Sequence, residues 1–181
     1  MRALVVYESV YGNTHAVADA IAEGLGDAEV LSVHEAAGRS GEAELLVVGG
    51  PTHMHGLATS RSREMAAAGA EEDGGMAIDP AATKEPGLRG YPHDLPDRQG
   101  ARAAAFDTRL DRSRWLSGVA SRGIAKRLSR RGYDVLASES FLVDASEGPL
   151  AEGELDRARE WGAELAGTVT SGGASAQGAV S

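Results

Sequence analysis

The segment Glu8–Thr14, with the sequence ESVYGNT, constrains the fold of this chain more than any other. It joins a strand-like apolar run, Arg2–Tyr7, to a helix-like run, Thr14–Leu25. A loop of small polar residues that opens a helix suits a phosphate, because the first N–H groups of the helix have no partner within it and the helix dipole adds partial positive charge. Gly12 lets the backbone approach an anion closely. The loop contains no lysine, in contrast to a Walker A loop, so it predicts a phosphate monoester held by amides and hydroxyls.

Strand-like and helix-like patterns alternate along the chain. Strands are predicted at Arg2–Tyr7, Ala28–Val33, Glu44–Gly49, Ala103–Phe106 and Tyr133–Val143, the last with a bulge at Ser138–Ser140. Helical patterns are predicted at Thr14–Leu25, Ser60–Ala68, Leu116–Leu128 and Leu155–Val169. The alternation predicts an α/β fold: a doubly wound parallel sheet of five strands with helices on both faces, in three layers. Ligands bind such sheets beyond the carboxyl ends of the strands.

The predicted domain covers residues 1–168 and contains an insertion at 69–100. The insertion is rich in glycine and proline and carries an acidic cluster, Glu71–Asp73, which is typical of a functional lid or a mobile insertion. Part of the insertion is expected to be helical near Leu88. Residues 169–181 are predicted to be a disordered tail, because Ser171–Ser181 is mostly Gly, Ser and Ala without periodicity.

Composition narrows the class of function. The chain has no cysteine, which excludes disulfides and thiolate chemistry. It has no apolar run of roughly 18 residues and no signal-like segment, so we expect no membrane insertion and a cytoplasmic location. A net charge of −9 argues against nucleic acid as the main partner.

The charge is distributed unevenly. The segment Leu110–Gly132 contains seven basic residues and one acid, a net charge of +6. The remainder of the chain therefore carries −15 (−9 minus +6). This segment is either a helix with a solvated basic face or a docking face for an acidic partner.

Three segments, taken in order, resemble the flavodoxin family. Residues 5–14 (VVYESVYGNT) are similar to the FMN phosphate loop of that family. Residues 47–52 (VVGGPT) are similar to the strand and turn before its first flavin-flanking loop, and Phe106–Arg109 occupies the position of its second. The resemblance covers about residues 1–168. It implies the strand order 2-1-3-4-5 and non-covalent binding of FMN.

Carried over by position, the resemblance implies three groups of cofactor-binding residues. They are the phosphate loop (Ser9, Val10, Tyr11, Gly12, Asn13, Thr14), the first flavin loop (Pro51, Thr52, His53, Met54, His55, Gly56) and the second flavin loop (Asp107, Thr108, Arg109, Trp115). Many flavodoxins stack aromatic rings on the flavin, whereas the first flavin loop here offers histidine and methionine. His53 and His55 are spaced as metal ligands can be, but no third ligand is evident, and no metal site or catalytic residue is predicted.

The leading expectation is therefore an FMN-binding protein that carries electrons between redox partner proteins. One alternative is a quinone reductase of the flavodoxin-like superfamily that takes electrons from NAD(P)H, because loss of stacking rings and a long insertion would suit an open flavin face. The other alternative is a binding module that kept the fold without the flavin.

Overall fold

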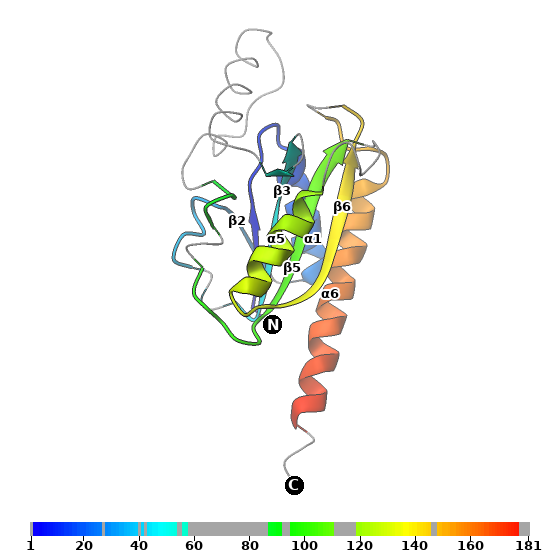
Figure 1. Ribbon diagram of the computed structural model, residues 1–181. Coiled ribbons are helices and arrows are strands. Elements are labelled where there is room, and N and C mark those ends of the chain that lie inside the picture. Colours follow the sequence, from blue (N-terminus) through cyan, green and yellow to red (C-terminus); the bar gives the residue numbers. More distant parts are fainter. Residues whose placement is uncertain are drawn as a thin grey trace.

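The computed structural model describes residues 2–26, 28–39, 41, 43–53, 56–57, 87–91, 95–110, 119–145 and 148–177. Five parallel strands lie in the order β2-β1-β3-β5-β6 (Figure 1). They are β1 (Ala3–Tyr7), β2 (Ala28–Ser32), β3 (Leu45–His53), β5 (Arg102–Leu110) and β6 (Asp134–Val143). The two-residue β4 (Gly56–Leu57) pairs antiparallel with the end of β3. With β4 set aside, this is the predicted order 2-1-3-4-5, and the flavodoxin-like fold class is confirmed.

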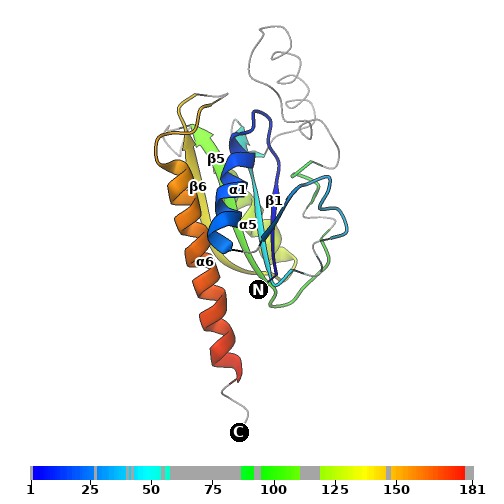
Figure 2. The same cartoon turned by 180° about the vertical axis from the view of Figure 1, so that it is seen from behind.

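Helices cover both faces of the sheet. Helices α1 (Asn13–Leu25) and α6 (Glu154–Gln177) lie on one face, and α5 (Ala120–Arg130) lies on the other (Figures 1 and 2). The strands supply both layers because successive side chains point to opposite faces. In β1, for example, Val5 packs on the α1 and α6 side while Val6 packs on the α5 side. Buried on both faces, these central strands read as continuous apolar runs in the sequence.

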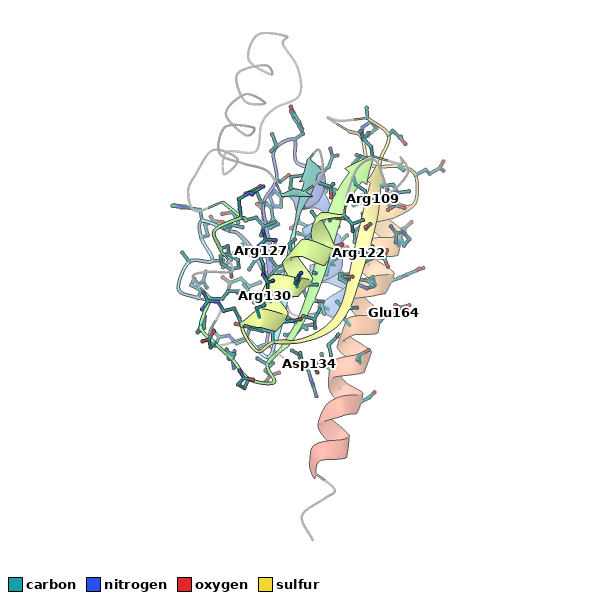
Figure 3. The ribbon with its side chains drawn as sticks, in the orientation of Figure 1. Arg109, Arg122, Arg127, Arg130, Asp134 and Glu164 are labelled. Carbon is teal, nitrogen blue, oxygen red and sulfur yellow. The ribbon has the colours of Figure 1, made fainter. Side chains whose placement is uncertain are left out.

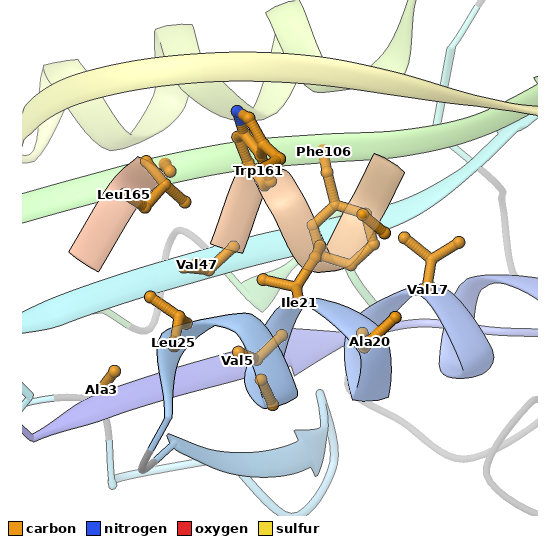
Figure 4. Packing of buried hydrophobic residues seen from close by; sticks show 14 of the residues in the cluster. Ala3, Val5, Val17, Ala20, Ile21, Leu25, Val47, Phe106, Trp161 and Leu165 are labelled. Carbon is orange, nitrogen blue, oxygen red and sulfur yellow. The ribbon is translucent and has the colours of Figure 1, made fainter. Parts of the chain in front are cut away.

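The core under α1 and α6 is built around aromatic and branched side chains (Figure 4). Phe106 of β5 is fully buried and reaches over β3 at Gly49, where a Cβ would overlap its ring. Phe141 packs edge-on against both Phe106 and Trp161, with ring centroids 6.3 and 6.1 Å apart. Trp161 thus belongs to the core, as the apolar face of its helix predicts.

Helices α1 and α6 cross in close contact at two glycines. A Cβ on Gly162 would overlap the Ile21 carbonyl oxygen, and a Cβ on Gly24 would overlap the Arg159 carbonyl oxygen. The absence of these two side chains lets the backbones approach each other. Nearby, Arg159 donates to Glu23 at 2.8 Å and links the same two helices at the surface.

The core under α5 includes the described end of the predicted insertion. Leu88, Tyr91 and Leu95 are all buried there beside α5 and the strands. Residues 87–91 form a turn, closed by a hydrogen bond from Tyr91 N–H to the Gly87 carbonyl at 3.1 Å. Residues 87–91 and 95–100 are therefore anchored to the sheet, and the lid or mobile character expected for 69–100 does not apply to them.

Several predicted boundaries are wrong, and the reasons are local. Strand β3 runs to His53 and β5 runs to Leu110, so the predicted loops after Gly49 and Phe106 begin with extended, hydrogen-bonded residues. These strand ends contain polar residues, so a search for apolar runs ends before the strands do. The bulge in β6 lies between Val135 and Ala137, which face Ala103 and Ala104, and not at Ser138–Ser140.

Helix α6 also continues to Gln177, beyond the predicted start of an irregular tail at Ser171. The domain limits at 168 and 169 remain predictions. Other predictions lie outside the described residues: the helix at Ser60–Ala68, most of the insertion at 69–100, and the side chains of Met54, His55 and Trp115.

Candidate functional site

The loop between β1 and α1 starts the helix without a side-chain cap. Gly12 precedes the first helical residue with φ 82° and ψ −16°, a left-handed conformation that favours glycine. An ordinary helix start places a serine, threonine, asparagine or aspartate there to accept an N–H bond. At α1 no side chain does so. A thirteen-residue helix thus begins here without a side-chain cap, and a helix start of this kind is where proteins bind anions.

Ser9 lies in the same loop and is buried at 2% exposure. Its Oγ has no hydrogen-bond partner among the residues that the structure describes. A buried hydroxyl without a partner costs free energy, so such groups are rare and mark places where a ligand or water completes the hydrogen bonding. Ser9 and the uncapped start of α1 thus fit the phosphate of FMN.

A buried hydrogen bond joins α1 to the end of β5. Thr14 Oγ1 and Thr108 Oγ1 lie 2.7 Å apart, and both residues are buried. The bond fixes the first turn of α1 against the strand that carries the second predicted flavin loop. Two of the three predicted groups are therefore in direct contact.

The ends of β3 and β5 are also joined, and together they cap α5. Thr52 Oγ1 donates to Asp107 Oδ2 at 2.8 Å and accepts from Ala120 N–H at 3.0 Å. Asp107 Oδ2 also accepts from Ser121 N–H at 3.0 Å. The residue before the helix, Val119, provides no cap of its own. A threonine and a carboxylate from two strands thus satisfy N–H groups at the positive end of the α5 dipole.

Asp107 and Arg109 bring charge to this edge of the sheet. Asp107 is completely buried, and its Oδ1 has no hydrogen-bond partner in the described part of the chain. Arg109, labelled in Figure 3, is 7% exposed and donates to the Leu110 carbonyl at 3.2 Å. At the carboxyl end of β1, on the same edge, Glu8 Oε2 accepts from Leu88 N–H at 2.7 Å, which fastens the loop after β1 to the core under α5.

A fourth segment reaches the phosphate loop. Gly148 lies against the Asn13 side chain, since a Cβ on residue 148 would come within 2.6 Å of Asn13 Nδ2. After this segment, at the start of α6, Glu154 Oε2 accepts from Leu142 N–H at 2.8 Å and pairs with Arg157 at 2.6 Å. The hydrogen bond from Arg157 to Glu154 is the main reason why the pKa of Arg157 is raised. The sequence of residues 147–150 (EGPL) indicates a turn into the last helix and a neighbour of this edge, and the contact of Gly148 with Asn13 agrees with that expectation.

The structure therefore brings together much of the predicted site. The described side chains of the phosphate loop, of Thr52 and of Asp107–Arg109 lie at the carboxyl ends of three adjacent strands. Val10 of the phosphate loop is buried at 3% exposure. The backbones of His53 and Gly56 pair across β3 and β4, and Pro51 faces Thr108 across the ladder. Among the described residues, no group of three or more His, Asp or Glu side chains is placed to hold a metal ion.

The comparisons with known proteins agree with this geometry. Residues 4–62 match the family model Flavodoxin_5, described as a flavodoxin domain. A search of curated proteins gave no match. Among solved structures, an archaeal flavodoxin is 21% identical, with 94% of this chain and 99% of that chain covered and a TM-score of 0.56. A flavodoxin from Streptococcus pneumoniae is 18% identical, with 93% and 99% covered and a TM-score of 0.62.

A third similar structure is described as a flavodoxin, WrbA-like protein from Agrobacterium tumefaciens. It is 17% identical, with 94% of this chain and 98% of that chain covered and a TM-score of 0.57. The chain therefore has a flavodoxin-like fold. The resemblance to the flavodoxin family, indicated first by the three loop sequences, is confirmed. None of the helices in the described ranges has the length and apolar character needed to cross a bilayer.

Proposed function

We propose that this protein binds FMN at the carboxyl edge of its sheet and carries electrons between redox partner proteins. The observation that carries the proposal is the buried Ser9 hydroxyl beside the uncapped start of α1. Ser9 and the backbone of Gly12–Thr14 would hold the phosphate. The ends of β3 and β5 would flank the ring system, with Thr52 and Asp107 fixing the two strand ends to each other.

The chain supplies binding and orientation, while FMN when bound supplies the one- and two-electron chemistry. The buried Thr14–Thr108 bond holds the phosphate loop at a set distance from the end of β5. Arg109 places a buried positive charge at the same edge, and a positive charge near a redox group favours its reduced form.

The test is a fluorescence titration of the purified apoprotein with FMN and, separately, with riboflavin. If the loop recognises phosphate, riboflavin binds at least about a hundredfold more weakly, since charge-assisted hydrogen bonds to the phosphate are lost.

Ser9→Ala is expected to weaken FMN binding about tenfold without lowering the stability of the apoprotein, because the hydroxyl has no partner there. Ser129→Ala, on the exposed side of α5, is the matched control. Equal binding of FMN and riboflavin would contradict the proposal.

A second function, quinone reduction with electrons from NAD(P)H, is supported by one observation. At the ends of β3 and β5 the described side chains Pro51, Thr52 and Asp107–Arg109 include no aromatic ring. A flavin flanked by them would leave a face open to a second substrate. Steady oxidation of NAD(P)H with a quinone would support this function, and no turnover across a range of quinones would oppose it. The third hypothesis is a binding module that kept the fold without the flavin, and tight FMN binding would exclude it.

A further inference from the structure

Three basic side chains form a stripe along α5. Arg122, Lys126 and Arg130 follow one another at four-residue spacing and are exposed. Residues four apart lie on the same side of a helix, about 6 Å apart along its axis. The opposite side, with Ala120, Ser121, Ile124 and Leu128, is buried against the sheet. Figure 3 shows Arg122, Arg127 and Arg130 along the outer side of α5.

The stripe is not explained by the stability of the helix. Like charges at four-residue spacing repel each other. No carboxylate among the described residues forms an ion pair with any of the three cations. Arg130 lies in the last turn, where the dipole favours a cation, but Arg122 lies in the first turn, where the dipole disfavours it and no acid is present.

Charge is also segregated across the sheet. Helix α5 contains four basic residues and no acid, a charge of +4. Helices α1 and α6, on the other face, together contain six acids and two arginines, a charge of −4. Because the whole chain carries −9, an anionic molecule is repelled in general, whereas α5 with its charge of +4 attracts it. Such a field orients an approaching partner.

The stripe begins at the candidate cofactor edge. Ala120 and Ser121 donate their N–H groups to Thr52 and Asp107, so Arg122 is the next residue after those two contacts. The positions of Lys126 and Arg130 follow at about 6 Å intervals away from the edge. A protein bound along the stripe would therefore lie beside the ends of β3 and β5.

From these observations we infer that the α5 stripe of Arg122, Lys126 and Arg130 docks an acidic redox protein. The inference rests on the proposed electron-transfer function and names the chemistry of the partner. The three cations lie at intervals of about 6 Å on a chain that is acidic as a whole, so they fit a partner with a discrete acidic patch. Long polyanions fit less well, because the net charge of −9 opposes their binding in general.

The test uses the full chain labelled with ¹⁵N, titrated at low ionic strength with an acidic plant-type [2Fe–2S] ferredoxin as the probe. The expected result is salt-sensitive binding with amide shifts concentrated in Ala120–Arg130. Arg122→Gln with Lys126→Gln should raise the dissociation constant about tenfold. The matched control, Arg39→Gln with Arg159→Gln, changes the net charge equally but away from α5 and should alter it less than twofold.

Four results would overturn the inference. They are no salt-sensitive shifts in α5, equal weakening by the stripe and control variants, tighter binding to a short DNA duplex, and tighter binding to vesicles containing phosphatidylserine. The amide shifts do not require the cofactor. Failure of the docking surface is therefore distinguishable from failure of FMN binding, which the flavin titration measures independently.

Discussion

At the scale of single residues, the candidate site is held by hydrogen bonds between segments far apart in the sequence. Thr52 and Asp107 are 55 positions apart, and Thr14 and Thr108 are 94 positions apart. Both hydrogen bonds are short, at 2.8 and 2.7 Å, and at least partly buried. Away from water a hydrogen bond is strong, and its loss lowers stability substantially. These hydrogen bonds hold the edge in one arrangement, which favours binding because less ordering is needed.

The cap on α5 gives a first prediction. Asp107→Ala should lower the free energy of unfolding by about 2 kcal/mol, because Ser121 N–H and the Thr52 hydroxyl lose their acceptor. Urea denaturation of the apoprotein measures this loss. Thr168→Val is the control, since that hydroxyl is exposed and bonds only to its own helix, and it should change stability by less than about 0.5 kcal/mol. An equal effect of the two variants would show that the cap contributes nothing.

Tyr133 gives a prediction about pH. Its side chain is buried, and desolvation raises the pKa of its phenol above the usual value near 10. The folded state therefore holds the proton more tightly than the unfolded state, so this contribution is complete below about pH 10 and is lost as pH rises through the folded pKa.

Tyr133→Phe removes that titration. Its hydroxyl has no hydrogen-bond partner among the described residues, so the variant should be at least as stable at pH 7. Above about pH 10 it should lose stability less steeply than the parent protein. Thermal unfolding at pH 7 and at several alkaline values measures both effects. Parallel alkaline declines would refute the assignment.

At the scale of elements, the two glycines between α1 and α6 set how closely the helices pack. Glycine in a helix is usually about 1 kcal/mol less favourable than alanine. At Gly162 that disadvantage is outweighed, because a Cβ would overlap the Ile21 carbonyl. Gly167 lies five residues later in α6 with nothing within 4 Å of its would-be Cβ.

These two positions form an internal comparison. Gly162→Ala should destabilise the protein by about 1 to 3 kcal/mol through overpacking, whereas Gly167→Ala should stabilise it by up to about 1 kcal/mol. Urea denaturation of both variants gives the two signs. If Gly162→Ala were also stabilising, the close crossing of α1 and α6 would be wrong.

The sequence predicts the strands themselves better than it predicts their ends. The apolar runs predict all five parallel strands, because strands buried on both faces need continuous apolar residues. They do not predict that β5 continues through Asp107–Arg109, because Asp107 and Thr108 are polar and their side chains bond to partners on other segments. A turn at Gly148 near this edge can be predicted, but its specific contact with Asn13 cannot, because that contact depends on how the whole edge folds.

At the scale of the whole molecule, the fold brings the phosphate loop and two strand ends to one edge, and it separates charge between the two helical faces. The strand order follows from the resemblance to the flavodoxin family, and the site residues follow from their positions in the three loops. The cap on α5 and the placement of the basic stripe beside it could not be predicted, because the helix start is defined by Thr52 and Asp107 rather than by a local sequence signal.

The central claim is that this edge binds FMN, and the visible absorption spectrum of the full chain after incubation with FMN and desalting tests it most directly. The account predicts retained flavin bands at close to equimolar FMN, and little retained riboflavin in a parallel sample. Protein that unfolds cooperatively, and is therefore folded, yet is colourless after desalting would contradict it.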